Sequence, residues 1–99
     1  MPENQLGMSK VVLLEFGADF DLWGNCPVQG LGTVQGRDLY FRARGNEWSF
    51  EVADGEGRLP SDGQTTEGFI CFGKHENSGW MPLGTAVEII IKCLSEYTG

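Results

Sequence analysis

The sequence predicts an α+β domain: a strongly curved antiparallel sheet of four to five strands, barrel-like in its extreme form, packed against one C-terminal helix. Apolar or alternating segments of strand length recur between glycine-rich turns, which is typical of antiparallel sheets. The C-terminal segment instead repeats its apolar side chains at helical spacing. The chain of 99 residues is long enough for one domain with a core of its own.

The charge and the apolar content exclude several classes of protein. A formal net charge of −7, from 14 acidic and 7 basic side chains, opposes binding to nucleic acid or anionic lipid. No apolar run reaches the roughly 18 residues of a membrane span, and the first residues lack the apolar stretch of a secretory signal. We therefore expect a cytoplasmic protein in which residues 1–8 are a disordered lead-in and residues 9–99 form the single domain.

The first part of the domain holds two strand candidates separated by an expected loop. Lys10–Phe16 is a nearly continuous apolar run with apolar side chains on both faces, which indicates a strand covered on both sides. Gly17–Cys26 carries glycine, aspartate and asparagine at loop-like spacing, so we expect a connection there. Val28–Val34 follows as a strand candidate weakened by two glycines.

The next two strand candidates, Asp38–Arg44 and Glu47–Ala53, are joined by Gly45-Asn46, which favours a two-residue hairpin turn. This turn fixes the register and puts six apolar side chains on one face: Leu39, Phe41, Ala43, Trp48, Phe50 and Val52. Six others share the opposite face, which we expect to be solvated: Tyr40, Arg42, Arg44, Glu47, Ser49 and Glu51. A platform for nucleic acid would expose aromatic and basic side chains together, so this function is not expected.

Two segments lie between the hairpin and the helix. Asp54–Glu67 is polar, rich in glycine and unusually long, which predicts either a mobile connection or a binding loop. Gly68–Lys74 is a further strand candidate, and like the first it is apolar on both faces.

The C-terminal helix is expected to run from Ala86 to Tyr97. Thr85 and Glu88 have the spacing of a capping box, in which each side chain bonds the other residue's backbone N–H, and Gly99 lies just beyond the end. The apolar side chains cover an arc of about 200°, whereas an amphipathic helix needs a stripe of only about 100°.

This surplus of apolar surface has two explanations. Either the sheet curls into a small barrel with the helix packed on it, or a second subunit covers the remainder. Two-fold dimers are the commonest oligomers, so we expect a homodimer. Its candidate contacts are Ile89 and Ile91 of the helix, with Trp23 or Trp80.

A catalytic or metal site is not expected, and no cofactor is implied. His75 is the single histidine, which excludes sites built from several histidines of one chain. Cys71 lies four residues before it on the same strand, roughly 13 Å away, so the two do not form a nucleophile pair. The three cysteines lack a CxxC pair and are expected to be free, buried and inert. Asp19 and Asp21 begin a pattern like a calcium loop, but Gly30 stands where that loop needs its bidentate glutamate.

The segments "GTVQGRDLYFRARGNEWSFEV" and "GWMPLGTA" resemble small bacterial orphan proteins carried on mobile integron gene cassettes. The resemblance covers Gly32–Ala86 and contains no catalytic motif. It implies a small cytoplasmic accessory protein of bacteria, compatible with a dimer, and it transfers no functional residue.

The function expected from the sequence is that of a non-catalytic binding or interaction module for a protein or small-molecule partner. Five exposed polar or aromatic side chains are its binding candidates: Asp19, Asp21, Trp23, His75 and Trp80. The alternative is a small-ligand-binding protein or enzyme with a pocket between sheet and helix, where His75 is the general-base candidate. A third reading, an acidic mimic of nucleic acid, needs acids clustered on one face, and along this sequence they are scattered.

Overall fold

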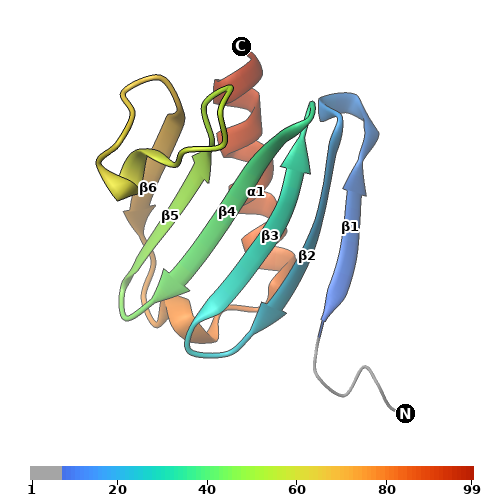
Figure 1. The fold of residues 1–99 in the computed structure, drawn as a ribbon. Coiled ribbons are helices and arrows are strands. Elements are labelled where there is room, and N and C mark those ends of the chain that lie inside the picture. The colour runs from blue at the N-terminus through green and yellow to red at the C-terminus, as the bar shows by residue number, and fades with distance from the viewer. Residues whose placement is uncertain (1–7) are drawn as a thin grey trace.

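The computed structural model describes residues 8–99, in which six strands are followed by one helix (Figure 1). The strands are β1 (Ser9–Leu13), β2 (Ala18–Gly24), β3 (Val28–Val34), β4 (Arg37–Arg44), β5 (Glu47–Val52) and β6 (Phe69–Lys74). The helix is α1 (Leu83–Thr98), and three short 3-10 helices are η2 (Leu14–Phe16), η3 (Pro60–Asp62) and η4 (Ser78–Trp80). Across residues 8–99, no helix combines the length and the apolar character needed to cross a membrane.

The strands lie in the sheet in chain order, from β1 at one edge to β6 at the other, and every neighbouring pair is antiparallel. Figure 1 shows α1 lying across one face of this sheet, so the predicted α+β class with a C-terminal helix is confirmed. The sheet has six strands rather than four or five, and it is open at β1 and β6 instead of closing into a barrel. Apart from Met8, the expected lead-in lies outside the described residues.

The additional strand is β2, which occupies most of Gly17–Cys26, where the sequence predicted a loop. Its side chains alternate: Ala18, Phe20 and Leu22 are buried on the helix side, and the residues between them face the other way. The loop prediction was wrong because it weighted the glycine and aspartate positions, whereas the period of two is the strand signal. The aspartates are tolerated because they stand on the uncovered face.

β4 and β5 form the predicted hairpin in the predicted register, with Phe41 opposite Phe50. Gly45 has a φ of 60°, the positive value that the two-residue turn requires. Phe41 and Phe50 are fully buried. Arg42, the next residue after Phe41, is half-exposed on the opposite face. The sequence therefore identified correctly which side of this hairpin faces the core.

One hydrophobic core fills the space between the sheet and α1. The helix contributes four buried side chains, Ala86, Ile90, Cys93 and Leu94, and the sheet contributes side chains from β2 to β5. Fully burying a large apolar side chain contributes about 1.5–3 kcal/mol, so this layer dominates the stability of the fold. Ile89 packs half-buried against the core.

The helix begins at Leu83, three residues before its predicted start, and the expected capping box is not formed. Pro82 stands at the N-cap, and its carbonyl accepts hydrogen bonds from the backbone N–H groups of Thr85 and Ala86. Pro82 has a φ of −60° and a ψ of 147°, the non-helical backbone that is typical of an N-cap residue. At the other end Gly99 caps the helix, as the sequence predicted, by donating its N–H to the Ser95 carbonyl.

The long connection between β5 and β6 is anchored to the sheet by a buried carboxylate. Glu51 was expected on a solvated face, but only 2% of its surface is exposed. Its two carboxylate oxygens accept hydrogen bonds of 2.7 and 2.8 Å from the backbone N–H and the hydroxyl of Ser61. The face was predicted correctly, and the burial was missed because η3 folds over Glu51 from a segment ten residues further along.

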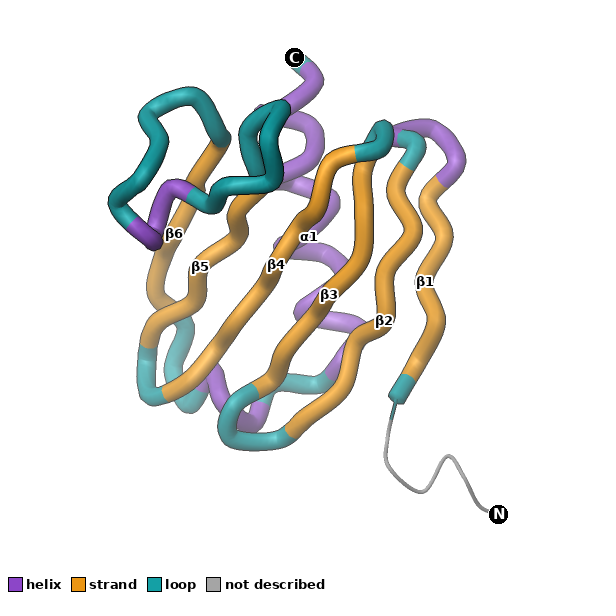
Figure 2. Tube along the Cα trace, in the orientation of Figure 1, coloured by secondary structure: helices purple, strands orange, loops and turns teal. Residues whose placement is uncertain are grey.

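Figure 2 shows this connection at the same end of the sheet as the β1–β2 and β3–β4 connections, which we call the loop end. The β2–β3 and β4–β5 turns lie at the opposite end, which we call the hairpin end. Within the connection, Asp54 accepts backbone hydrogen bonds of 2.8 Å from Glu56 and 2.9 Å from Arg58. The connection is therefore a structured loop, built around two carboxylates.

Candidate functional site

The face of the sheet opposite α1 has no helix over it, although the β5–β6 loop covers part of it at the loop end; we call it the open face. Four large apolar side chains stand on it, from β1, β3 and β6, with 40–73% of their surface exposed: Val12, Leu31, Ile70 and Phe72. The most exposed of them is Phe72, at 73%. Polar and charged side chains of β2, β4 and β5 stand between them on the same face, so the open face mixes apolar and charged groups instead of presenting one continuous apolar patch.

Charges on the open face are separated along the strands. β4 runs from the loop end to the hairpin end, and its outward positions change from Asp38 at the start to Arg42 and Arg44 at the finish. Lys74 adds a third basic group at the hairpin end, opposite Glu47 of β5. At the loop end Asp19 adds a second acid, which forms an ion pair with Lys10. The open face thus has an acidic end and a basic end.

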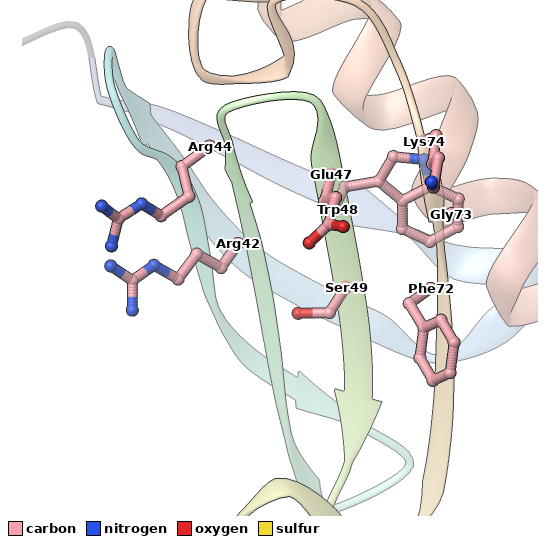
Figure 3. A pocket seen from close by; sticks show the side chains of 8 residues that line it. All are labelled: Arg42, Arg44, Glu47, Trp48, Ser49, Phe72, Gly73 and Lys74. Atoms are coloured by element: carbon pink, nitrogen blue, oxygen red, sulfur yellow. The ribbon is translucent and has the colours of Figure 1, made fainter.

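A shallow cavity of about 510 Å³ lies at the basic end, and we call it the sheet-face pocket. It is lined by residues of β4, β5 and β6: Arg42, Arg44, Glu47, Trp48, Ser49, Phe72, Gly73 and Lys74. Figure 3 shows Arg42 and Arg44 extending side by side in one direction, while the indole of Trp48 extends the opposite way, toward Gly73. A Cβ on Gly73 would stand 2.6 Å from that indole, so the absent side chain makes room for the ring.

The two arginines carry hydrogen-bonding capacity that residues 8–99 do not use. Among residues 8–99, neither Arg42 nor Arg44 has a carboxylate within 4.0 Å. The Nε of Arg42 is buried and has no hydrogen-bond partner in the described part of the chain. An unmet buried donor of this kind costs about 1–3 kcal/mol, which an acceptor from a partner can recover. Guanidinium groups bind carboxylates and phosphates through paired hydrogen bonds.

The five sequence-predicted binding residues are divided between three places. Asp19, Asp21 and Trp23 stand on the open face of β2, within a strand and not on the expected loop. Trp23 shares a cross-strand row with Arg42, so it belongs to the same surface as the pocket. Trp80 is 63% exposed in η4, just before the helix, and His75 follows β6. The structure therefore assembles three of the five on one face and leaves Trp80 and His75 elsewhere.

A second cavity, of about 360 Å³, lies between the edge strand β6 and α1, and we call it the edge groove. Its lining combines aromatic, thiol and charged side chains: Trp48, Cys71, Phe72, Lys74, His75, Ile89, Lys92, Cys93 and Glu96. His75 Nδ1 lies 3.0 Å from the carbonyl oxygen of Glu76, and no bond joins it to either cysteine. Within residues 8–99, no three side chains of the metal-binding types gather closely enough to hold a metal.

The three thiols are free, as predicted, but they are not all buried. Cys26 is exposed, Cys71 is half-buried and Cys93 is buried at 1% exposure. The sulfur atoms of Cys71 and Cys93 lie 3.4 Å apart, and Glu96 Oε1 lies 3.8 Å from that of Cys71. Burial, followed by the contact with Cys71, raises the pKa of the Cys93 thiol well above its ordinary value.

The residues that define the sheet-face pocket are not among the binding candidates predicted from the sequence. Arg42, Arg44 and Phe72 were assigned to solvated or doubly covered strand faces. A signal was present, because the alternation in β4 and β6 puts all three on the face that lacks the large apolar side chains of the hairpin. Recognising it required knowing that a single helix covers only one face.

Comparisons of the chain with known protein families, with curated proteins and with solved structures find no match. The resemblance to proteins of integron cassettes therefore stays a prediction from the sequence. The chemistry of the open face and of the edge groove is the basis for assigning a function.

Proposed function

We propose that the protein is a non-catalytic interaction module whose open face binds an acidic segment of a protein partner, and that this partner is a second copy of the chain. The observation that carries the proposal is a pair of arginines that have no carboxylate partner within residues 8–99, Arg42 and Arg44, in the same shallow pocket as the exposed ring of Phe72. An exposed ring together with unpaired guanidinium groups is the composition found at protein interfaces, where aromatic residues and arginine are enriched.

The shape of the surface favours a protein over a small ligand. Small-molecule sites are enclosed and bury most of the ligand, whereas the sheet-face pocket is a shallow hollow on a broad sheet. Six strands about 4.8 Å apart, each about 20 Å long, present a face of roughly 24 by 20 Å. That is about 480 Å² per copy, or about 960 Å² in total, which is the size of a weak or transient protein interface.

The chain supplies the acidic segment itself. The β5–β6 loop stands over the open face at the loop end, where Ser61 bonds Glu51, and its exposed charges are mostly acidic: Glu56, Asp62 and Glu67 against Arg58. A two-fold axis lying in the plane of the sheet and crossing the strands brings the loop end of one copy over the hairpin end of the other. The acidic loop of each copy then faces the arginines of its partner, and the interface is closed by symmetry.

The same surface argues against nucleic acid as the partner. Asp19, Asp21 and Asp38 share the open face with the arginines, and the chain carries a net charge of −7. Phosphate binding would have to overcome that repulsion, and it depends on basic groups that dominate a surface. We also retain the cytoplasm as the location, which suits three unpaired thiols.

The self-association is tested by sedimentation velocity over a wide range of protein concentration. The expected result is a monomer–dimer equilibrium that weakens with added salt, because screening reduces the attraction between loop and pocket. Arg42→Glu should abolish the dimer, and Lys92→Glu, the same charge change on α1, should leave it intact. A dimer that persists in the Arg42→Glu variant would contradict the proposed interface.

A charge swap tests the pairing of loop and pocket directly. A variant with Arg42→Glu and Arg44→Glu, and another with Asp62→Lys and Glu67→Lys, should each be monomeric. Mixed in equal amounts, they should form a heterodimer, because the acidic pocket then meets a basic loop and the native pocket meets a native loop. Failure of the mixture to associate, with both variants folded by circular dichroism, would rule out this arrangement.

A synthetic peptide spanning residues 54–67 separates the two parts of the proposal. If the native chain is monomeric but the peptide shifts the NMR signals of Arg42 and Phe72, the face binds acidic segments and the partner is another protein. If neither dimer nor peptide binding is seen, the interaction function is wrong. Binding of a single-stranded oligonucleotide that Arg42→Glu abolishes would replace it with nucleic-acid recognition.

The edge groove supports a second candidate, the small-ligand-binding protein or enzyme considered from the sequence. The observation in its favour is that His75, Lys92 and Glu96 line a cavity between β6 and α1, where that reading placed its pocket. A thermal-shift screen of metabolites should then give a ligand whose stabilising effect is reduced by His75→Ala. A ligand that stabilises the native and His75→Ala proteins equally would remove the histidine from the site.

A further inference from the structure

We infer that Cys71 and Cys93 form a reversible oxidation site, in which a hydroperoxide converts the two thiols into a disulfide that joins the edge strand β6 to α1. The inference is independent of the proposed binding function. It rests on the placement of the two sulfur atoms, on the groove beside them and on the difference in exposure between the two thiols.

The two thiols are brought together by the fold. Cys71 points from β6 to the helix side of the sheet, in the same cross-strand row as the buried Phe50, and Cys93 lies in the middle of α1. Their sulfur atoms are 3.4 Å apart, so they need to approach by about 1.4 Å to reach a disulfide bond. Twenty-two positions separate the two residues in sequence, and the bond would close the whole segment between them.

The edge groove gives an oxidant access to the pair. Both cysteines line this cavity of about 360 Å³, but Cys71 is half-buried whereas Cys93 is only 1% exposed. The more accessible Cys71 is therefore the site of first attack, and the buried Cys93 is the resolving thiol. Burial raises the pKa of Cys93, so that thiol stays protonated and unreactive toward external reagents until its neighbour is oxidised.

The reaction balances with one peroxide for each disulfide. The Cys71 thiolate attacks the terminal peroxide oxygen, the O–O bond breaks, and a sulfenic acid forms on Cys71; the departing oxygen takes up the proton that the thiol lost and leaves as water from hydrogen peroxide, or as an alcohol from an alkyl hydroperoxide. Cys93 Sγ then attacks the sulfenic sulfur, the S–O bond breaks, and the hydroxyl leaves as water with the proton of the Cys93 thiol. The two thiols lose two electrons, the peroxide gains them, and a dithiol reductant reverses the change by exchange.

Cys26 is the internal control for this site. It is exposed in the β2–β3 turn and its sulfur has no thiol neighbour among the described residues. Oxidation of Cys26 can give only a sulfur oxygen acid, such as a sulfenic acid, or a disulfide bond to another molecule. Replacing it, as Cys26→Ser, leaves the Cys71–Cys93 pair as the only thiols and removes the intermolecular products that Cys26 would form.

The test uses the full chain carrying Cys26→Ser, treated with one equivalent of hydrogen peroxide under native conditions. The expected product is about 2 Da lighter, with no free thiol, and it regains both thiols with dithiothreitol. Trypsin cuts after Arg58, Lys74 and Lys92. A disulfide-linked pair of peptides, residues 59–74 and 93–99, therefore identifies the bond, and neither cysteine has to be substituted. The unfolding midpoint should rise by roughly 10 °C on oxidation.

Three outcomes would overturn the inference. The first is a product with added oxygen on Cys71 and no linked peptides, and the second is two thiols that stay reduced while Cys26 of the native chain reacts. The third is a disulfide that forms only after unfolding in urea, because the native placement would then play no part. Cys71→Ala in the same background should give no linked peptide, and because Cys71 is half-buried whereas Cys93 is fully buried, it is the variant of the pair that disturbs the core less.

Discussion

Phe50 and Phe72 stand on neighbouring strands of one sheet, but their side chains differ greatly in exposure. Phe50 faces α1 and is completely buried, whereas Phe72 faces away from the helix and is 73% exposed. Both residues are phenylalanines with the same strand propensity. Their distances from the hairpin end differ by only one row. The difference lies only in which face of the sheet the helix covers, so the covered face carries stability and the open face is free to carry binding.

The largest expected effect on stability comes from truncating the buried ring of the pair. Phe50→Ala removes a buried ring and leaves a cavity, which should lower the free energy of unfolding by about 3–5 kcal/mol. Phe72→Ala, the matched control, should change it by no more than about 0.5 kcal/mol, while it weakens the proposed dimer. Urea denaturation measures the first quantity and sedimentation the second. Equal losses of stability in the two variants would mean that the open face is covered within the single chain.

A second pair of residues sharpens the comparison within the open face. Glu51 and Glu47 lie on β5 and face the same way, but Glu51 is buried beneath Ser61 and Glu47 is exposed. Glu51→Ala should cost about 1–3 kcal/mol of unfolding free energy, because the hydrogen bonds that anchor the loop are lost. Hydrogen exchange should show the amide of Ser61 losing its protection. Glu47→Ala should leave both the stability and that protection unchanged.

The acid dependence of stability should distinguish the same loop from the rest of the surface. A hydrogen bond from the Arg58 backbone, followed by one from the Thr65 hydroxyl, holds the pKa of Asp54 well below its usual range. The unfolded chain then binds the proton more readily, so Asp54 stabilises the fold at neutral pH. That contribution declines as the pH falls below about 3.9, the value for an unperturbed aspartate, and vanishes below the folded pKa. Between about pH 5 and 2, the free energy of unfolding, measured by urea denaturation, should depend less on pH in the Asp54→Asn variant than in the Asp38→Asn variant.

The smallest expected effect concerns the start of the helix that covers the core face. A working capping box would make Thr85→Ala cost about 1 kcal/mol. Here Pro82 occupies the N-cap and the side chain of Thr85 makes no capping bond, so the change should be within about 0.5 kcal/mol. A loss near the larger value, measured by urea denaturation, would place the helix start at Thr85.

Local sequence patterns predicted the elements of this molecule that depend only on neighbouring residues. Gly45-Asn46 set the turn, and the alternation on each side of it set the register that pairs Phe41 with Phe50. Gly99 ended the helix where expected. The same logic would have found β2, because Ala18–Gly24 alternates as regularly as the hairpin, had the aspartates on its open side not been taken as loop residues.

The candidate sites were less predictable because each joins residues from separate elements. Nothing around Glu51 indicates that Ser61 will cover it, and nothing around Cys71 indicates that Cys93 will lie 3.4 Å away. Likewise, Asp19, Asp21 and Trp23 were chosen as loop residues, and they share a surface with Arg42 only because β3 brings β2 and β4 into one cross-strand row.

The sequence alone determined the α+β class, the central hairpin with its two faces and the C-terminal helix, because turn chemistry and side-chain periodicity act over a few residues. The tertiary structure decided that the sheet stays open, that one face has no helix over it, and that two distant thiols meet beside a groove. These outcomes depend on which face a single helix can shield, and a helix can bury only the side of the sheet on which it lies.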